Sequence, residues 1–476
     1  MKISQNFFRF FIALIFFSCQ ASQAFAFLAF SVKNEEIPRT KVLFFGFESS
    51  DPQMNKDINE ILERIRKNLK TTDLFEVVKQ TGQMEMNMPK PVEIGIAGAA
   101  TNAGIGGVVI PEAITVESLP NFEKYGKAGI GAIVIGQFNR DSMGNLETRV
   151  RMWDVLDQRQ LFGKFYSASQ DNYRKMSNII SGEIYKAISG EKSSHFDSQI
   201  LYVSETGSAK KRTKKISLID FDGENRRLIT DGSDLVLTPI FSKKPDEIFY
   251  LRYFEKRQPQ IFSMDLKTLK THKIGGFPGT TFAASAHPKD RNTILLSAII
   301  DGNSDIYEMN ILTNEARRLT KSPAIDTTPS YSPDAKYIAF SSDRDEGQQI
   351  YVMNSNGDSV KRISSEGGNY SKPMWSPDGT LIAFTKIKGN QFMVGVMTPT
   401  GKGEKTLAKG YLVEGAKWSP NGRYLIYSKK LGAYGRDSIP RLFIVDIITG
   451  FEFEVPTPDG EGATDPDWAK SVKKTC

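Results

Sequence analysis

Pro373-Met374-Trp375-Ser376-Pro377-Asp378-Gly379 is one copy of a motif that recurs along the C-terminal half of the chain. Related stretches return about every 43 to 50 residues from Leu237 to Ala469. They are anchored at Pro239, Ala286-His287-Pro288, Pro329, Pro373, Lys417 and Pro466. A fixed period of this length, made of short apolar strands and turn residues, is typical of a β-propeller.

One repeat predicts one blade of such a propeller. Trp375 ends an inner strand and offers a large apolar ring to the neighbouring blade. Ser376-Pro377-Asp378-Gly379 predicts a β-turn, because proline presets φ and glycine accepts a positive φ. Residues 381–385 then form a second strand. The preceding repeat supplies an apolar third strand at 349–353 and a charged outer strand at 361–364, which protects the blade edge.

The two ends of the repeat region complement each other. Three strands at residues 200–203, 216–219 and 226–229 precede the first anchor and lack an inner strand. The last anchor, at Trp468, has almost no chain after it. We therefore expect the strand at Trp468 to pair with the strand at Leu201 and to close a ring of six blades over residues 198–470.

The N-terminus predicts export. Lys2 and Arg9 flank an apolar run, and Ala24-Phe25-Ala26 offers small residues for cleavage, so residues 1–26 are interpreted as a signal peptide. An uncleaved anchor helix and a lipoprotein signal through Cys19 are the alternatives. Cleavage would leave Cys476 as the one thiol, so no intrachain disulfide could form.

Between the signal and the propeller, residues 41–190 predict a small α/β domain. An apolar strand at 42–47 precedes an amphipathic helix whose apolar positions run from Ile58 to Leu69. Further expected elements are strands at 74–78 and 130–136, a meander over 147–167 and a final helix at 171–189. A Met-, Gly- and Ala-rich insert at about 81–119 and an N-terminal segment at 27–40 lack a core pattern and are expected to be flexible. The predicted fold is thus an α/β N-terminal domain followed by an all-β six-bladed β-propeller.

Catalytic or metal motifs are sparse. His195, His272 and His287 have no metal-ligand spacing, and no Gly-x-Ser-x-Gly elbow occurs. The basic run Lys210–Lys215 is interpreted as a solvated hairpin loop, with contact to an acidic partner or anionic lipid left open. The formal net charge is +7, or +5 without Lys2 and Arg9, which is mild. No basic face rich in aromatic residues indicates nucleic-acid binding. We expect no cofactor and no metal.

Polar residues gather just upstream of the anchors, where each blade joins the next. Any one of them is interpretable as an ordinary turn residue, but as a ring they would surround one mouth of the central channel. Such a concave, polar, partly aromatic surface suits a loop or peptide from a partner. The candidate residues are Asp234, Thr280, Asp326, Thr327, Asn369, Tyr370, Glu414, Thr464 and Asp465.

The whole layout resembles the TolB family, the periplasmic component of the Tol–Pal envelope system. Residues 330–334 and 375–379, with their following strands, are similar to the family's middle blades, and Asp467-Trp468-Ala469 is similar to its closing strand. Two departures stand out. The insert at 81–119 is longer than the family usually carries, and Ala286-His287-Pro288 has lost its aromatic residue, which predicts a loosely packed third blade.

This resemblance implies a non-enzymatic periplasmic adaptor, expected to be monomeric, that supports outer-membrane integrity and constriction during cell division. The lipoprotein Pal would bind the mouth, where the resemblance adds Ala283 to the residues above. TolA would bind the mature N-terminal segment, and the chain would associate peripherally with membranes through its partners. Other outer-membrane proteins are left open as partners. The expected TolA-binding residues are Phe27, Phe30, Val32, Glu35 and Ile37.

One enzymatic alternative remains open at this point. An exported propeller enzyme, such as a calcium-dependent lactonase, would use Asp326, Asn369 and Glu414 as oxygen ligands. Calcium titration distinguishes this alternative from the adaptor, because ion binding to the folded state would stabilise the protein.

Overall fold

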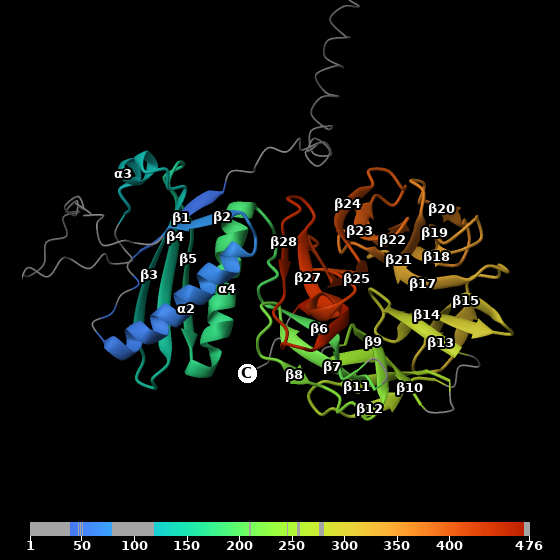
Figure 1. Cartoon of the computed structure of the whole chain (residues 1–476). Coiled ribbons are helices and arrows are strands. Elements are labelled where there is room, and N and C mark those ends of the chain that lie inside the picture. Colours follow the sequence, from blue (N-terminus) through green and yellow to red (C-terminus); the bar gives the residue numbers. More distant parts are fainter. Residues whose placement is uncertain are drawn as a thin grey trace, which may run out of the picture. The chain divides into compact units, whose positions relative to one another are not determined.

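The computed structural model describes residues 39–45, 47, 49, 51–78, 119–208, 211–244, 246–254, 258–275 and 280–470. The predicted signal peptide, the TolA-binding segment and almost all of the insert at 81–119 lie outside the described residues. Figure 1 labels the helices and strands of the described residues. None of the helices in the described ranges is long and apolar enough to span a membrane.

The N-terminal domain is built on a mixed five-stranded sheet with the order β2-β1-β3-β4-β5. Strand β1 pairs in parallel with β2 and β3, whereas β3, β4 and β5 form an antiparallel meander. The strands are β1 (Thr40–Phe45), β2 (Phe75–Val78), β3 (Ala132–Arg140), β4 (Leu146–Asp154) and β5 (Arg159–Ala168).

Two helices cover one face of this sheet, and their sequences explain their limits. Helix α2 (Pro52–Lys70) begins after Asp51, whose carboxylate accepts a hydrogen bond from the Gln53 amide at 2.9 Å. Helix α4 (Tyr173–Ser189) follows the 3-10 turn η1 (Gln170–Asn172) and ends at Gly190, which has a φ of 72°. Both helices bury their apolar side against alternate residues of β1, β3 and β4.

The opposite face of the sheet has a smaller cover. Leu43, Ile133 and Trp153 pack there against Tyr125 of the short helix α3 (Phe122–Lys127), an element that the sequence analysis did not predict. The cover reaches the C-terminal half of β4, where the rings of Phe122 and Trp153 lie 5.8 Å apart.

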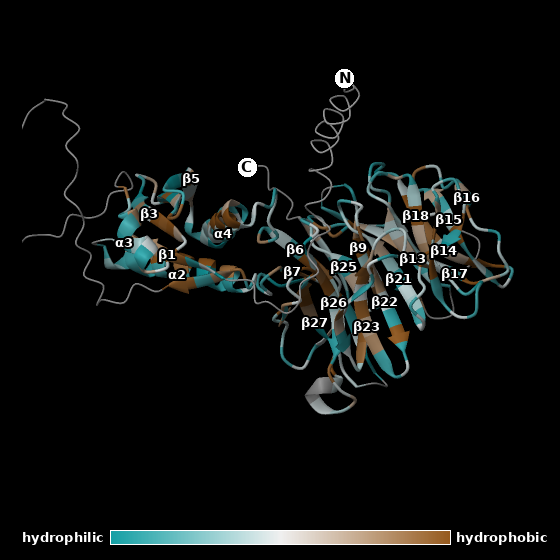
Figure 2. Ribbon diagram, turned by 90° about the horizontal axis from the view of Figure 1, so that it is seen from above, coloured by the Kyte–Doolittle hydropathy of each residue, from teal (hydrophilic) through white to brown (hydrophobic). Residues whose placement is uncertain are grey.

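The remaining strands form six four-stranded antiparallel sheets, which confirms the predicted six blades. Figure 2 shows that their strands carry apolar residues while the connecting loops are largely hydrophilic. The first blade contains β29 (Gly462–Lys470), β6 (Ser198–Thr206), β7 (Thr213–Asp220) and β8 (Arg227–Leu228). The second and third contain β9 (Leu235–Phe241), β10 (Glu247–Tyr253), β11 (Gln260–Asp265) and β12 (Thr271–Lys273), then β13 (Thr280–Ala286), β14 (Thr293–Ile300), β15 (Asn303–Asn310) and β16 (Ala316–Arg318).

The last three blades follow the same order from inner to outer strand. The fourth contains β17 (Asp326–Tyr331), β18 (Tyr337–Ser342), β19 (Gln349–Asn354) and β20 (Lys361–Arg362). The fifth contains β21 (Asn369–Trp375), β22 (Ile382–Lys388), β23 (Gln391–Met397) and β24 (Lys405–Gly410). The sixth contains β25 (Leu412–Trp418), β26 (Tyr424–Lys430), β27 (Arg441–Asp446) and β28 (Glu452–Glu454).

The ring closes as the sequence predicts. Strand β29 pairs with β6, so that Trp468 lies opposite Ile200. The indole of Trp468 donates a hydrogen bond to the Ser198 hydroxyl at 2.7 Å. Asp467 accepts one from the Phe241 amide of the second blade at 2.7 Å. The closing strand therefore ties the C-terminal part of the propeller to its first two blades.

The Ser-Pro-Asp-Gly turns fold for a local reason. The Ser376 hydroxyl donates to Asp378 at 2.5 Å and accepts from the Leu381 amide at 3.0 Å, while Gly379 adopts a φ of 77°. Serine and aspartate thus satisfy backbone groups that the turn leaves unpaired, and glycine relieves the left-handed strain.

The third blade differs at its anchor, as the missing aromatic residue suggests. The ring of His287 lies 4.6 Å from that of Tyr331 and accepts the backbone amides of Lys289 and Asp290 through Nδ1. A cavity of about 50 Å³ lies between the second and third blades, beside Leu296 and Met309. Looser packing of this blade stays a prediction.

The junction between the two domains contains a buried histidine. His195 is 0 % exposed, and neither ring nitrogen has a hydrogen-bond partner among the described residues. The rings of Tyr185, Phe196 and Tyr424 lie within 5.8 Å of the imidazole. Burial, followed by the positive charge of Arg423, lowers the pKa of His195 to about 3.

We expect this histidine to make the folded chain sensitive to mild acid. Because the unfolded imidazole titrates near pH 6.5 and the folded one near 3, its contribution to stability is complete above about pH 6.5 and is lost as the pH falls toward 3. Its slope approaches about 1.4 kcal/mol per pH unit. Denaturant unfolding of His195→Gln between pH 7 and 4.5 should show a shallower loss of stability than the parent, whatever the absolute cost of the substitution. Parallel curves would contradict the prediction.

Candidate functional site

The inner strands of all six blades line a central cavity of about 110 Å³. Its wall is mainly apolar and includes Pro329, Pro373, Met374 and Pro466. The polar groups that reach the cavity are few, with Lys372, Lys417 and Asp465 carrying the charges. The inner strands leave only this small space at the centre of the ring. A partner protein would therefore contact the propeller at a mouth of the central channel.

Each inner strand bends at the same place. Strands β9, β17, β21, β25 and β29 shift register at a residue with positive φ, and β13 shifts register at the equivalent point. A bulge leaves one residue unpaired and increases the local twist. Proline follows it in four of these strands and donates no amide toward the channel, which suits an edge strand. The residues with positive φ are Thr238, Thr328, Lys372, Gly415 and Asp465.

Opposite charges meet on neighbouring inner strands. The Lys372 ammonium lies 2.6 Å from the Glu414 carboxylate, and the two side chains are 37 % and 41 % exposed. Burial raises the pKa of Asp465 beside them, while Lys372 opposes that rise. Glu414 and Asp465 therefore lie near the same lysine, and their role in binding a partner stays a prediction.

Two predicted mouth residues are buried instead of exposed. Asp326 is 0 % exposed and accepts two hydrogen bonds from Arg344, at 3.0 and 2.9 Å. Thr327 is 8 % exposed. The structure thus assigns Asp326 to an internal ion pair, because its carboxylate needs a partner once the strand start is covered. We correct the expectation that Asp326 faces a partner.

The same correction applies to Tyr370 but not to its neighbour. Tyr370 is 0 % exposed, packs against Phe384 and donates its hydroxyl to Glu404 at 2.7 Å. Burial and Glu404 raise the pKa of the Tyr370 phenol. Asn369 is exposed at the start of β21. The alternation of a strand explains the difference, because consecutive side chains point to opposite faces.

The other candidates occupy separate environments. Asp234 pairs with Arg252 beside a different pocket, lined by Thr230 and Tyr250. Thr464 donates to Glu205 at 3.3 Å. Thr280 and Ala283 belong to β13, but their side chains lie outside the described part of the structure.

The basic run lies in the β6–β7 hairpin and is partly neutralised. Glu205 is 6 % exposed and binds Lys214 at 2.6 Å and Arg212 at 3.1 Å. Because Glu205 also accepts from Thr464, the hairpin and the closing strand share one polar network at this end of the propeller.

Exposed apolar side chains surround the same end, and the sequence analysis missed them. They come from the starts of inner strands, from the end of β14 and from the β26–β27 connection. All of these chain segments lie at one end of the blades, because inner strands start where second strands end. The sequence signal that could have identified several of these side chains is an apolar residue at or immediately before the start of an inner strand. The residues are Leu235, Ile299, Ile325, Tyr411, Leu431 and Tyr434, with exposed fractions from 39 % to 89 %.

The calcium alternative lacks a suitable constellation. Among the described residues no group of three or more His, Cys, Asp or Glu side chains could hold a metal ion. Two of the three proposed ligands already have cations of their own, since Asp326 pairs with Arg344 and Glu414 with Lys372.

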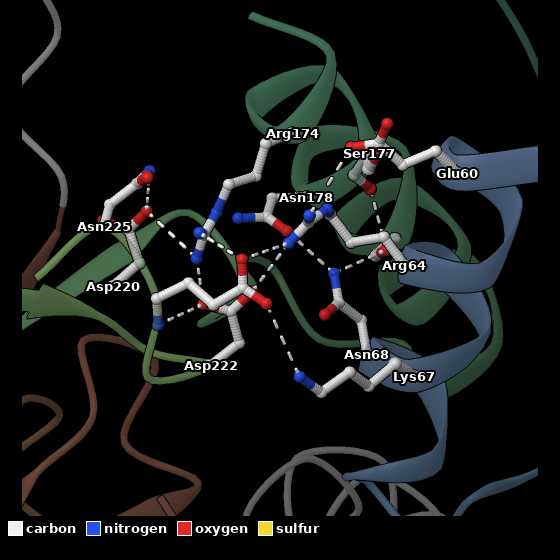
Figure 3. A network of polar contacts seen from close by, with 12 residues as sticks. Glu60, Arg64, Lys67, Asn68, Arg174, Ser177, Asn178, Asp220, Asp222 and Asn225 are labelled. Carbon is white, nitrogen blue, oxygen red and sulfur yellow. Dashed lines mark hydrogen bonds and ion pairs between the residues drawn. The ribbon is translucent and has the colours of Figure 1, made fainter. Parts of the chain in front are cut away.

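A second polar constellation was also not predicted. Figure 3 shows Arg64 of α2 and Arg174 of α4 pointing toward Asp222, which lies in the turn after β7. Arg64 lies 3.4 Å from Asp222, and Arg174 also binds Glu224 at 3.0 Å. Asp222 is 3 % exposed in its side chain. These contacts connect the α/β domain with the propeller and form no open site.

Comparison with known proteins gives the family. A model of the TolB beta propeller domain matches residues 185–472. The chain is 37 % identical over 396 residues to the Tol-Pal system protein TolB of Gluconobacter oxydans (strain 621H), which covers 80 % of this chain and 86 % of that protein. The chain belongs to the TolB family. It is therefore a non-enzymatic protein of the Tol–Pal type, and the lactonase alternative is set aside.

A solved structure gives the same fold. The crystal structure of TolB from Acinetobacter baumannii is similar with a TM-score of 0.73 and 24 % identity, over 91 % of this chain and 97 % of that one. The likeness extends over both domains, which confirms the α/β domain followed by a six-bladed propeller.

Proposed function

We propose that this chain is a periplasmic adaptor that binds the lipoprotein Pal at the mouth of its propeller and TolA through residues 27–38. In this role it would support outer-membrane integrity and constriction of the envelope during cell division. Membership of the TolB family supports the proposal at the level of the system. The exposed apolar side chains at this end of the propeller, among them Tyr411 and Tyr434, are the observation that favours a protein partner there.

The chemistry of the mouth suits a macromolecular surface better than a small molecule. Tyr411 and Tyr434 are 56 % and 89 % exposed, and aromatic side chains of this kind are frequent hot spots of interfaces. The Lys372–Glu414 pair on the inner strands is only partly buried. Such a rim charge pair contributes orientation more than affinity. The narrow apolar cavity behind the mouth would admit little more than a protruding side chain.

Removing the two tyrosines should weaken Pal binding at least about thirtyfold, because even one interface hot spot contributes about 2 kcal/mol or more. The variant is Tyr411→Ser/Tyr434→Ser, measured by calorimetric titration with the soluble domain of Pal. Its melting temperature should stay close to that of the parent, since both side chains are exposed. Adding Glu414→Lys should weaken binding further, because it reverses the charge of a partly exposed carboxylate at the proposed mouth.

Two controls separate the site from general effects. Leu312→Ser removes a 66 % exposed side chain from the β15–β16 turn, away from the mouth, and should leave Pal binding unchanged. Deletion of residues 27–38 should abolish TolA binding but leave the mouth competent for Pal. Unaltered Pal affinity in the double tyrosine variant would refute the mouth assignment, and TolA binding after the deletion would refute the assignment of the N-terminal segment.

A further inference from the structure

The outer edge of the α/β domain is an unusually open strand. Strand β5 lies at the end of the order β2-β1-β3-β4-β5, and no other described strand pairs with it. It is 10 residues long, and the side chain of Phe165 at its centre is 55 % exposed. Edge strands present a row of unpaired N–H and C=O groups that can pair with another chain.

One face of the sheet near this edge is basic. Val150 and Met152 of β4 are 0 % exposed in the core shared with the helices, so Arg149 and Arg151 project from the opposite face. Neither arginine has an ion-pair partner among the residues that the structure describes. The two guanidinium groups therefore lie without an ion-pair partner on this face of the sheet. Helix α3 and its flanking Phe122 contact the same face at Trp153, nearer the C-terminal end of β4.

The register brings these arginines to the edge. Arg149 lies opposite Phe165, and Arg151 lies opposite Gly163. A Cβ atom at Gly163 would be 3.5 Å from Cγ of Arg151 and 2.8 Å from Nε2 of Gln160. Those two side chains therefore occupy the surface that a larger residue would cover. The absence of a side chain at residue 163 leaves room over β5 for the side chains of Arg151 and Gln160.

We propose that β5 binds an extended acidic segment of another protein as an added strand of this sheet. Main-chain hydrogen bonds to the free edge would supply affinity, and alternate side chains would supply selectivity. On the open face, carboxylates of the incoming strand would meet Arg151 and Arg149, and an apolar side chain would pack on Phe165. This site is separate from the propeller mouth and does not depend on the function proposed for it.

The charges favour an acidic partner over a second copy of this chain. Pairing of β5 with another β5 would join two edges that both carry positive charge, which like-charge repulsion disfavours. Arg159 and Lys164 add further positive charge along the edge, although each has a local acidic partner, Asp157 and Glu183. Positive charge on an edge strand prevents self-association while leaving pairing with an acidic strand favourable.

The test uses the full mature chain and a fluorescein-labelled decapeptide of alternating glutamate and valine. Anisotropy should show saturable binding below about 1 mM, and hydrogen exchange should slow in the peptides covering Arg159–Ala168. Arg149→Glu/Arg151→Glu should weaken binding about tenfold, because it replaces two attractive contacts by repulsive ones. A matched control, Lys361→Glu/Lys402→Glu, makes the same change in net charge at exposed propeller positions and should bind normally.

Three peptide and protein results would overturn the proposal. They are the absence of binding up to about 1 mM, equal binding of a decapeptide with proline at its centre, and equal binding to the Arg149→Glu/Arg151→Glu variant. Protection outside β5 would place the peptide elsewhere and would also overturn it. A concentration-dependent doubling of mass, with β5 protected without peptide, would show that a second copy occupies the edge. The peptide controls need no protein variant, so the proposal stays testable even if a substitution impairs folding.

Discussion

Truncation after Glu461 is expected to abolish cooperative unfolding of the propeller. The cut removes β29, whose pairing with β6 supplies the inner strand of the first blade. It exposes the partners of Ala463 and Trp468, which are 0 % and 6 % exposed. Loss of a buried tryptophan alone costs about 3–5 kcal/mol. The free energy of unfolding of a whole domain is only about 5–15 kcal/mol, so opening the ring should leave no stable native state.

The measurement is scanning calorimetry together with near-ultraviolet circular dichroism. The control is truncation after Lys470, which preserves the whole of β29. A milder variant, Trp468→Phe, keeps most of the apolar area but loses the 2.7 Å hydrogen bond to Ser198, and should melt at an intermediate temperature. If the chain cut after Glu461 unfolded with the enthalpy and midpoint of the parent, ring closure would not support the fold.

The closure was predictable because the sequence repeats its own pattern. The three strands before the first anchor lack an inner strand, and the last of the six anchors supplies an inner strand without a blade. Pairing the two is the one arrangement in which every blade has four strands. The observed pairing of Trp468 with Ile200 follows from that count. Local turn chemistry was equally predictable, because Ser376, Asp378 and Gly379 act on backbone groups within five residues.

The environment of individual mouth residues was not predictable in the same way. Asp326 is neutralised by Arg344, which lies 18 residues later, and Tyr370 finds Glu404 34 residues later. Such partners depend on how strands of one blade pair, and a polar residue at a strand start is equally compatible with exposure. Glu414 remains partly exposed on its inner strand, so its place at the mouth stays a prediction.

Contacts between the two domains could not be predicted from the sequence of either domain alone. The α/β sheet and its two main helices follow from apolar periodicity, but nothing local in Arg64 or Arg174 identifies the turn at Asp222. These pairs join residues 158 and 48 positions apart. A charged residue on a helix face is usually solvated, so the sequence gives no sign that both arginines are largely buried.

Asp222→Ala is expected to uncouple the α/β domain from the propeller. Asp222 is 3 % exposed and lies between Arg64 and Arg174, whose side chains are 15 % and 12 % exposed. Removing it leaves two largely buried guanidinium groups with the more distant or more exposed carboxylates of Asp220, Glu224 and Glu60. Breaking a buried ion pair on one side typically costs about 3–5 kcal/mol, because the remaining charge stays desolvated.

Calorimetry should therefore resolve two unfolding transitions in this variant where the parent shows one. Proteolysis between Gly190 and Asp197, the connection after α4, should accelerate as the domains separate. Asp157→Ala is the matched control, because its pair with Arg159 is more than 60 % exposed on both sides and should contribute less than about 1 kcal/mol. A single transition at the parent's midpoint would show that apolar packing around His195 and Phe196 suffices to hold the domains together. The arginine cluster would then be incidental to their coupling.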